Sequence, residues 1–168
     1  THFQRTGYPD EREPTTQLDD LDMSYNGNQL SDVTDKANDI TYMTTTNFIQ
    51  NGKAPASYTY NANGAMETDA NDGVVFMEYD NFGYAKAIYF KSGCSIKYVH
   101  TPTGEKLKET YITSVPNITK PVGLPFSLAP PEIQSVNTKD YWGTDIICKN
   151  GTPQQFFFDG GFANIKGN

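Results

Sequence analysis

The stretch YTYNANG, residues 58–64, joins an alternating segment to a turn. In residues 57–60 every second side chain would lie on one face of a β-strand. Asn61 can begin a chain reversal because its side chain bonds nearby backbone groups, and Gly64 can take backbone angles that other residues resist. The stretch therefore predicts one arm and the turn of a β-hairpin.

Similar hairpin signals recur along the chain, each with a Tyr before the turn and a Gly within it. Tyr60 and Tyr79 are 19 residues apart, and Tyr79 and Tyr98 are again 19 apart. A fixed period is the signature of a repeat, so we expect a tandem array of hairpins. The predicted turn residues are Asn26, Gly27, Asn61, Gly64, Asp80, Gly83 and Gly104.

The predicted fold is all-β, with tandem antiparallel β-hairpins that form a twisted or spiralling sheet. We divide the chain into four parts. They are a polar N-terminal linker (1–17), the hairpin array (18–112), an irregular Pro-rich crossing segment (113–137), and a degenerate C-terminal hairpin with its tail (138–168).

Two segments interrupt the alternating pattern. Residues 41–56 either carry a degenerate repeat or form an insertion loop, which we favour because no Tyr-Asx pair followed by Gly lies there. We expect the crossing segment to be extended at its prolines, which restrict the backbone, and to contain one short helical turn that begins at Pro130 or Pro131. Its apolar residues expected to pack against the sheet are Val122, Leu124, Phe126 and Leu128.

Composition and charge exclude several classes of partner. The chain has 13 basic and 20 acidic residues, a formal net charge of −7, and no cluster of basic residues. We therefore expect no binding of nucleic acid, which needs a positive stripe. No run of about 18 apolar residues occurs, so we expect no insertion into a membrane. Cys94 and Cys148 are interpreted as two buried or half-buried thiols or, in an extracellular protein, a disulfide.

Catalytic and metal-binding signals are weak. Acidic residues cluster within residues 19–22 and 69–72, but turns commonly contain Asp, and the loop spacing of an EF-hand calcium site is missing. His100 follows a predicted strand and is interpreted as an exposed turn residue rather than a catalytic base. We expect no enzymatic activity, no cofactor and no metal site, with a carbohydrate-active enzyme as the less favoured alternative.

The recurring Tyr, Asx and Gly residues resemble the Rhs or YD-repeat family, whose unit is usually Tyr-x-Tyr-Asp-x-x-Gly. Near matches are YTYNANGAM and MEYDNFGYAKAI, and looser matches are IKYVHTPTGEKL and MSYNGNQL. The segments YWGTDIICKNG and FFFDGGF resemble the C-terminal unit of Rhs-like proteins from Bacteroidetes. Where the family commonly has Arg after the Gly, this chain has Ala65, Tyr84 and Glu105.

This resemblance implies hairpins that wind into a spiralling sheet, which in long arrays closes into a shell around a C-terminal effector. It implies a structural or binding segment of a secreted or cell-surface protein, acting as a β-sheet scaffold or shell wall. The expected partners are a carbohydrate, another protein, the rest of the same chain, or a second copy held weakly through sheet edges.

The alternative function is a carbohydrate-binding module that uses exposed aromatic residues. Such residues can stack on sugar rings, although aromatic pairs across neighbouring strands also stabilise a sheet. The candidate ligand-binding residues are Tyr58, Tyr60, Tyr79, Tyr89, Tyr98 and Tyr111.

Overall fold

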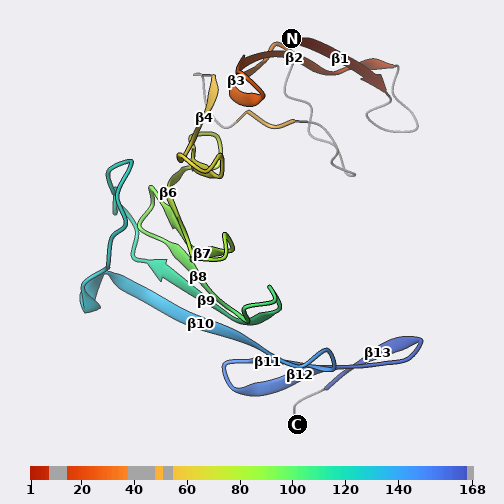
Figure 1. Cartoon of the computed structure of the whole chain (residues 1–168), viewed down its shortest axis with the longest axis vertical. Coiled ribbons are helices and arrows are strands. Elements are labelled where there is room, and N and C mark those ends of the chain that lie inside the picture. The colour runs from red at the N-terminus through yellow and green to blue at the C-terminus, as the bar shows by residue number, and fades with distance from the viewer. Residues whose placement is uncertain (8–14, 38–47, 51–54, 166–168) are drawn as a thin grey trace. The chain divides into compact units, whose positions relative to one another are not determined.

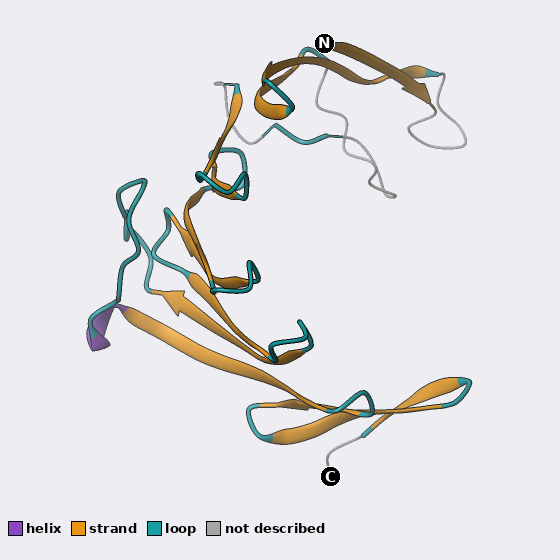
Figure 2. Cartoon of the chain, viewed as in Figure 1, coloured by secondary structure: helices purple, strands orange, loops and turns teal. Residues whose placement is uncertain are grey.

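The computed structural model describes residues 1–7, 15–37, 48–50 and 55–165. The chain forms two compact units, Thr1–Gly73 and Val74–Asn168 (Figure 1). Both consist of antiparallel strands that follow one another in sequence order, which confirms the predicted all-β fold of tandem hairpins. Within the described residues the only helical segment is one short 3-10 turn (Figure 2).

The described residues of unit 1 form five strands. They are β1 (His2–Gly7), β2 (Thr16–Asn26), β3 (Gln29–Asp35), β4 (Ala56–Tyr60) and β5 (Met66–Asp69). The predicted linker over residues 1–17 is wrong for residues 2–7, because β1 pairs with β2 along its length. Polar contacts, rather than buried apolar side chains, join these two strands. Arg5 lies opposite the buried Asp19, and its guanidinium is 2.5 Å from the Asp19 carboxylate.

Two predicted segments of unit 1 fall largely outside the described residues. Residues 8–14 of the predicted linker are not described, and neither is most of the predicted insertion loop at residues 41–56. Within that loop, the backbone N–H of Phe48 donates to Asp19 at 2.6 Å.

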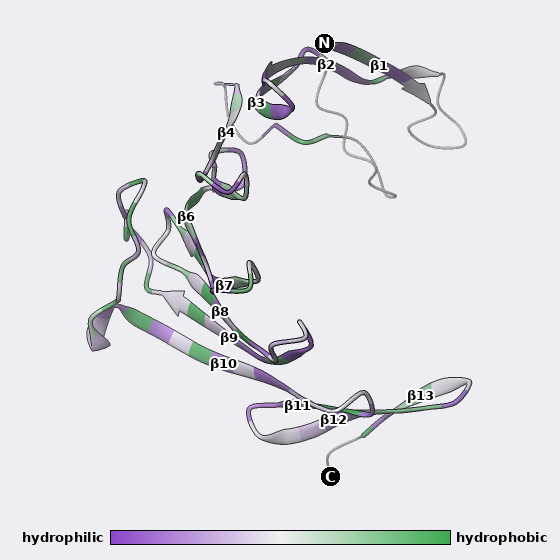
Figure 3. Ribbon diagram, viewed as in Figure 1, coloured by the Kyte–Doolittle hydropathy of each residue, from purple (hydrophilic) through white to green (hydrophobic). Residues whose placement is uncertain are grey.

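In unit 2 the structure describes eight strands and the 3-10 turn. They are β6 (Val74–Tyr79), β7 (Ala85–Phe90), β8 (Ser95–His100), β9 (Lys106–Ser114), η1 (Pro130–Glu132), β10 (Ile133–Trp142), β11 (Ile146–Lys149), β12 (Thr152–Phe158) and β13 (Gly161–Asn164). Hydrophobic and hydrophilic residues are interleaved along β10, as expected for a strand with two different faces (Figure 3).

Three hairpins close with the same five-residue turn, at residues 61–65, 80–84 and 101–105. In each, the first N–H donates to the fifth carbonyl at 2.9 Å, and the fourth N–H donates to the first carbonyl at 2.9 to 3.1 Å. A side-chain oxygen of the first residue accepts the fifth N–H at 3.0 to 3.1 Å. The repeated turn therefore fixes the register of each hairpin with the same three hydrogen bonds.

The third turn is out of phase with the 19-residue period. Asn61 and Asp80 are 19 residues apart, but the third turn begins at Thr101, 21 residues after Asp80. His100 therefore occupies the place that Tyr60 and Tyr79 hold, and Tyr98 lies two residues earlier on its strand. The hydroxyl of Thr101 supplies the side-chain acceptor that Asx supplies elsewhere.

Neighbouring turns of unit 2 are in contact through a side chain. Gly83 and Gly104 are the fourth residues of their turns, with φ of 86° and 91°, in the region that L side chains avoid. A Cβ on Gly83 would meet nothing within 4 Å, whereas a Cβ on Gly104 would lie 2.7 Å from the ring of Tyr84. Tyr84 also packs against His100, with ring centroids 5.5 Å apart. One hairpin thus packs on the turn of the next.

The core of unit 2 lies between the sheet and the Pro-rich segment that joins β9 to β10. Val75, Ala87 and Tyr89 are buried, and Phe126 of the crossing segment meets Tyr89 edge to face at 5.1 Å between ring centroids. The N–H of Gly123 donates to the carbonyl of Val75 at 2.8 Å. The segment therefore packs against the sheet, as predicted.

The details of that prediction are partly wrong. Phe126 is packed, but Val122 and Leu124 are 66% and 63% exposed. The irregular part is also shorter than residues 113–137, because β9 runs to Ser114 and β10 begins at Ile133. The short turn beginning at Pro130 is confirmed. The predicted single C-terminal hairpin is instead part of a run of four strands, with the expected turn after Lys149.

We expect Gly104→Ala to cost more stability than Gly83→Ala. Both variants place a Cβ at positive φ, which costs about 1 to 2 kcal/mol. At residue 104 the Cβ must also displace the Tyr84 ring, adding about 1 kcal/mol. Urea unfolding measures both costs. In a Tyr84→Ala background the two substitutions should cost the same, and equal costs in the native background would contradict the proposed contact.

Candidate binding surface

The six candidate tyrosines do not share one surface. Tyr58 and Tyr60 belong to β4 of unit 1, while Tyr79 ends β6 of unit 2. Tyr89 is only 6% exposed and packs in the core, whereas Tyr98 and Tyr111 lie on the opposite face of the sheet. The strand register explains why these tyrosines lie on different faces. Tyr89 pairs with Ser95 on β8, so the two side chains share a face. Tyr98 lies three residues beyond Ser95 on the same strand and therefore points to the other face, because successive side chains alternate.

The predicted turn residues lie in turns of the structure. Asn26 is the last residue of β2, and Gly27 lies in the tight connection from β2 to β3. The others occupy the first or fourth positions of the five-residue turns. Asn61 and Asp80 hold the first position in theirs, and the Oδ1 atom of each accepts two backbone N–H groups of its own turn. These residues shape the hairpins, and they present no cluster of side chains toward a ligand.

The most densely bonded group on the face of Tyr98 and Tyr111 is centred on Glu109 of β9. Glu109 pairs in register with Tyr98 on β8 and with Lys139 on β10, so these side chains emerge on one face. Its side chain is only 7% exposed. Lys106 Nζ donates to one carboxylate oxygen and Tyr111 Oη donates to the other, both at 2.5 Å.

Aromatic rings flank the ammonium group of Lys106. Its Nζ lies 5.0 Å from the ring centroid of Tyr98 and 6.0 Å from that of Tyr141. Both separations are within the range of cation–π attraction. The cluster of Tyr98, Lys106, Glu109, Tyr111 and Tyr141 is called the Glu109 cluster below.

The protonation states of the Glu109 cluster follow from its contacts. Burial raises the pKa of Glu109, but the hydrogen bonds from Lys106 and Tyr111 outweigh burial and lower that pKa overall. The same bond to Glu109, together with burial, raises the pKa of Tyr111 to about 12. At neutral pH the carboxylate is therefore charged and the phenol is neutral. Both oxygens of Glu109 are already bonded, which suits a structural role better than acid–base chemistry.

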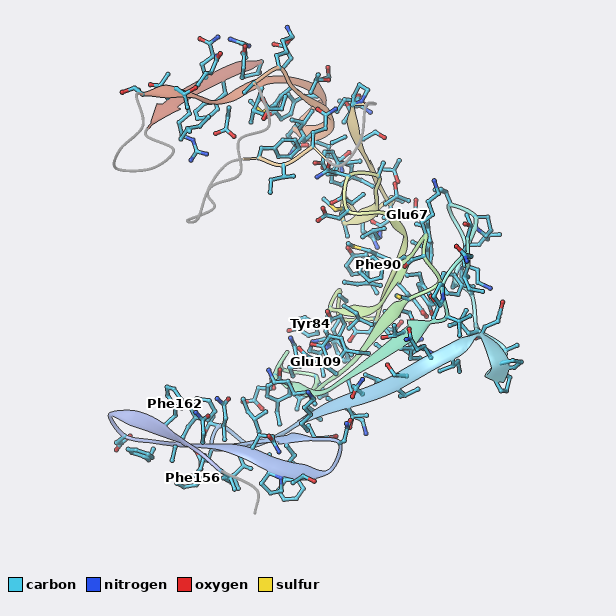
Figure 4. The ribbon with its side chains drawn as sticks, turned by 180° about the vertical axis from the view of Figure 1, so that it is seen from behind. Glu67, Tyr84, Phe90, Glu109, Phe156 and Phe162 are labelled. Atoms are coloured by element: carbon cyan, nitrogen blue, oxygen red, sulfur yellow. The ribbon has the colours of Figure 1, made fainter. Side chains whose placement is uncertain are left out.

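A groove of about 430 Å³ lies beside the Glu109 cluster in unit 2. Tyr111, which is 38% exposed, belongs to both. The other groove residues used below are Asn137, Lys139, Lys149, Gln155 and Asn164, from strands β10 to β13. Figure 4 shows Glu109 and Phe162 on one side of the ribbon of unit 2 and Phe156 on the other side.

Three acidic residues in the described part of unit 1 are engaged in structural contacts, namely Asp20, Asp22 and Asp69. His2 lies between Asp20 and Asp22, with ring nitrogens 3.3 and 2.8 Å from their carboxylates, and Lys36 also bonds Asp22. Asp69 accepts the N–H groups of Asn71 and Asp72 and thereby shapes the turn after β5. Over the ranges that the structure describes, no three acidic, His or Cys side chains gather as a metal site.

Other single residues have equally local roles. The ring of His100 packs at a tilt against the rings of Tyr84 and Tyr98, at 5.5 and 5.9 Å between ring centroids. Cys94 and Cys148 are both free thiols, so the disulfide left open by the sequence is not formed. Among the described residues, no helix is both long and apolar enough to cross a bilayer.

Sequence reasoning missed the residues that stand out on both faces. Glu109, Lys139 and Lys149 meet only through strand pairing, which the sequence alone does not reveal. On the opposite face Trp142 and Phe156 flank Ile146 in register, and both aromatic side chains are exposed. The aromatic run FFF at residues 156–158 and the lone Trp were visible signals of this exposed patch.

Replacing Glu109 with Gln should lower the free energy of unfolding at neutral pH by about 2 kcal/mol, because Lys106 and Tyr111 lose a charged acceptor. The pKa of Glu109 is lower in the folded protein than its usual 4.5. Its stabilisation is therefore present above about pH 4.5 and is lost as the pH falls through the folded value.

Chemical unfolding of both proteins across this pH range checks the expectation. The difference in unfolding free energy between the native chain and Glu109→Gln should shrink toward zero in acid. A difference that stays constant from neutral pH to about pH 3 would show that the charge of Glu109 does not stabilise the fold.

Comparison with known proteins leaves the family of the chain open. No protein-family model matches the sequence, and no curated protein is significantly similar to it.

Proposed function

We propose that the chain is a structural segment of YD-repeat type, a β-sheet scaffold or shell wall in a secreted or cell-surface protein. The observation that carries this proposal is the repeated five-residue turn at residues 61–65, 80–84 and 101–105, with the same hydrogen bonds each time. Repetition of one hairpin turn along a chain is what an array of hairpin repeats requires.

The way in which the strands are stabilised supports a scaffold role. Within each unit, every strand pairs with its neighbours in sequence. The buried hydrophobic core is small, with Val33 and Ala56 in unit 1 and a few residues around Val75 in unit 2. A hairpin that buries so little depends on the hairpins next to it, as in other repeat proteins.

The proposal assigns no catalytic role to the chain. Its support is the engagement of the acidic side chains in structure: Asp19 bonds Arg5, Asp80 caps a turn, and Glu109 bonds Lys106 and Tyr111. A pair of carboxylates that hydrolyses a glycosidic bond must keep oxygens available for the substrate and a water molecule. Each of these residues uses at least one carboxylate oxygen in a contact within the fold.

The partner that the scaffold proposal requires is another β-strand. In the described part of the chain β13 pairs only with β12, and its residues are exposed throughout. An unpaired strand edge presents N–H and C=O groups that another strand can bond. We propose that further strands of the same protein, or a second copy of this chain, pair with this edge.

Light scattering across a concentration series tests the edge pairing. The mean mass of the isolated chain should rise with concentration, and Ala163→Lys on β13 should suppress the rise, because an edge lysine opposes strand addition. Asn81→Lys, in an exposed turn, adds the same charge away from that edge and should leave the rise intact. A constant monomer mass at every concentration would count against the proposal.

A second candidate function is carbohydrate binding through an exposed aromatic side chain. The observation that favours it is the position of Tyr111, exposed at the rim of the groove and beside polar side chains. Sugar sites combine such a ring with hydrogen-bonding groups.

For this candidate we expect Tyr111→Ala to abolish retention on a glycan array while circular dichroism stays unchanged. Tyr25→Ala removes an exposed tyrosine of unit 1 and serves as the control. Equal retention of both variants would exclude Tyr111 as the recognition residue.

A further inference from the structure

Two lysines face each other in the groove of unit 2. Lys139 on β10 and Lys149 on β11 are register partners, so their side chains emerge side by side on one face of the sheet. Both line the groove. Like charges directly opposite each other on neighbouring strands destabilise a sheet, so this pair has a cost that an anion between the two ammonium groups would remove.

Within the described part of the chain, these two charges are compensated only in part: Lys139 Nζ lies 5.0 Å from the ring centroid of Tyr141, and Glu109 is the register partner of Lys139 on β9. Within the described residues, neither Lys139 nor Lys149 forms an ion pair, and the groove lining includes no Asp or Glu. By contrast, Lys108 in the same sheet lies 3.3 Å from Asp140. The groove is therefore a positive site on a chain whose formal net charge is −7. Charge complementarity points to an anionic ligand.

The other polar groups of the groove suit hydroxyl groups. The proton of Tyr111 Oη is directed to Glu109, which leaves the lone pairs of the phenol oxygen to accept from a ligand. Asn164 Oδ1 accepts from Gln155 Nε2 at 2.9 Å, which leaves the Asn164 amide N–H groups to donate. Beside the lysine pair, the groove thus offers a hydrogen-bond donor, an acceptor and an aromatic ring. These groups suit a ligand that has a hydroxylated ring and a carboxylate.

We propose that the groove binds a saccharide that carries a carboxylate, such as a uronic acid unit. The carboxylate lies between Lys139 and Lys149, and the sugar hydroxyls bond Tyr111 and Asn164. The groove volume of about 430 Å³ falls within the range of small-molecule sites. This inference rests on the second candidate function, carbohydrate binding, and is independent of the scaffold role.

Titration calorimetry of the full chain tests the proposal with three matched probes. The probes are a galacturonic acid tetramer, the same tetramer with methyl-esterified carboxyl groups, and a tetramer of glutamate. The acidic sugar should bind about tenfold more tightly than its ester, because a charge-assisted hydrogen bond is lost on esterification. The glutamate tetramer should bind more weakly than the acidic sugar.

Variants assign the effect to the lysine pair. Lys149→Gln and Lys139→Gln should each remove the preference for the acid over the ester. Lys97→Gln neutralises an exposed lysine on the opposite face and should keep that preference. Without ligand, Lys149→Gln should raise the thermal midpoint, because it removes a like-charge pair, so loss of binding is separated from loss of fold.

The outcomes distinguish this proposal from the broader proposal that the chain binds a carbohydrate. Equal affinity for acid and ester would overturn the lysine assignment while leaving carbohydrate binding in place. Equal or tighter binding of the glutamate tetramer would overturn the choice of a saccharide. Binding of none of the probes by a folded sample would overturn the proposal and leave the scaffold role untouched.

Discussion

Each repeated hairpin depends on a five-residue turn whose fourth residue must adopt a left-handed backbone. Only glycine does so without strain, and the first residue then closes the turn with its own side chain, as Asp80 does for Tyr84. The turn determines which residues pair across the hairpin. Because side chains alternate along a strand, that choice also determines which of them share a face. The register of the turns therefore controls which side chains share a face on β6 and β7 and on β8 and β9.

Two different faces result from this register in unit 2. On one face Tyr89 and its buried neighbours pack against Phe126 of the Pro-rich segment. On the other face Glu109 organises Lys106 and Tyr111, and the groove with Lys139 lies beside them. A one-residue slip of β9 would turn Glu109 and Tyr111 toward the face that carries Tyr89. Glu109 therefore resists this slip, because it would lose its place opposite Tyr98 and Lys139.

Much of the hairpin architecture could be predicted from sequence, because alternation, Asx and Gly are local signals. The position of each turn relative to the repeat period was harder to predict. Thr101 replaces Asx at the start of a turn and His100 replaces Tyr before it, so the regular spacing of Tyr98 was misleading. Strand β1 was missed because polar contacts such as Arg5 with Asp19 hold it, which leaves no apolar alternation to detect. Lys139 and Lys149 of the groove are brought together by the pairing of β10 with β11, so no single stretch of sequence predicts that they are neighbours.

The central claim is that the repeated turn, bonded in the same way in successive hairpins, holds the array together. Native-state hydrogen exchange measured amide by amide by NMR tests it most directly. The N–H groups of Asp80 and Thr101 close their hairpins and should be protected to a similar degree, as strongly as amides within the flanking strands. The exposed N–H of Asn81 should exchange freely by comparison. Rapid exchange at residues 80 and 101, with protection confined to the strands, would contradict the account.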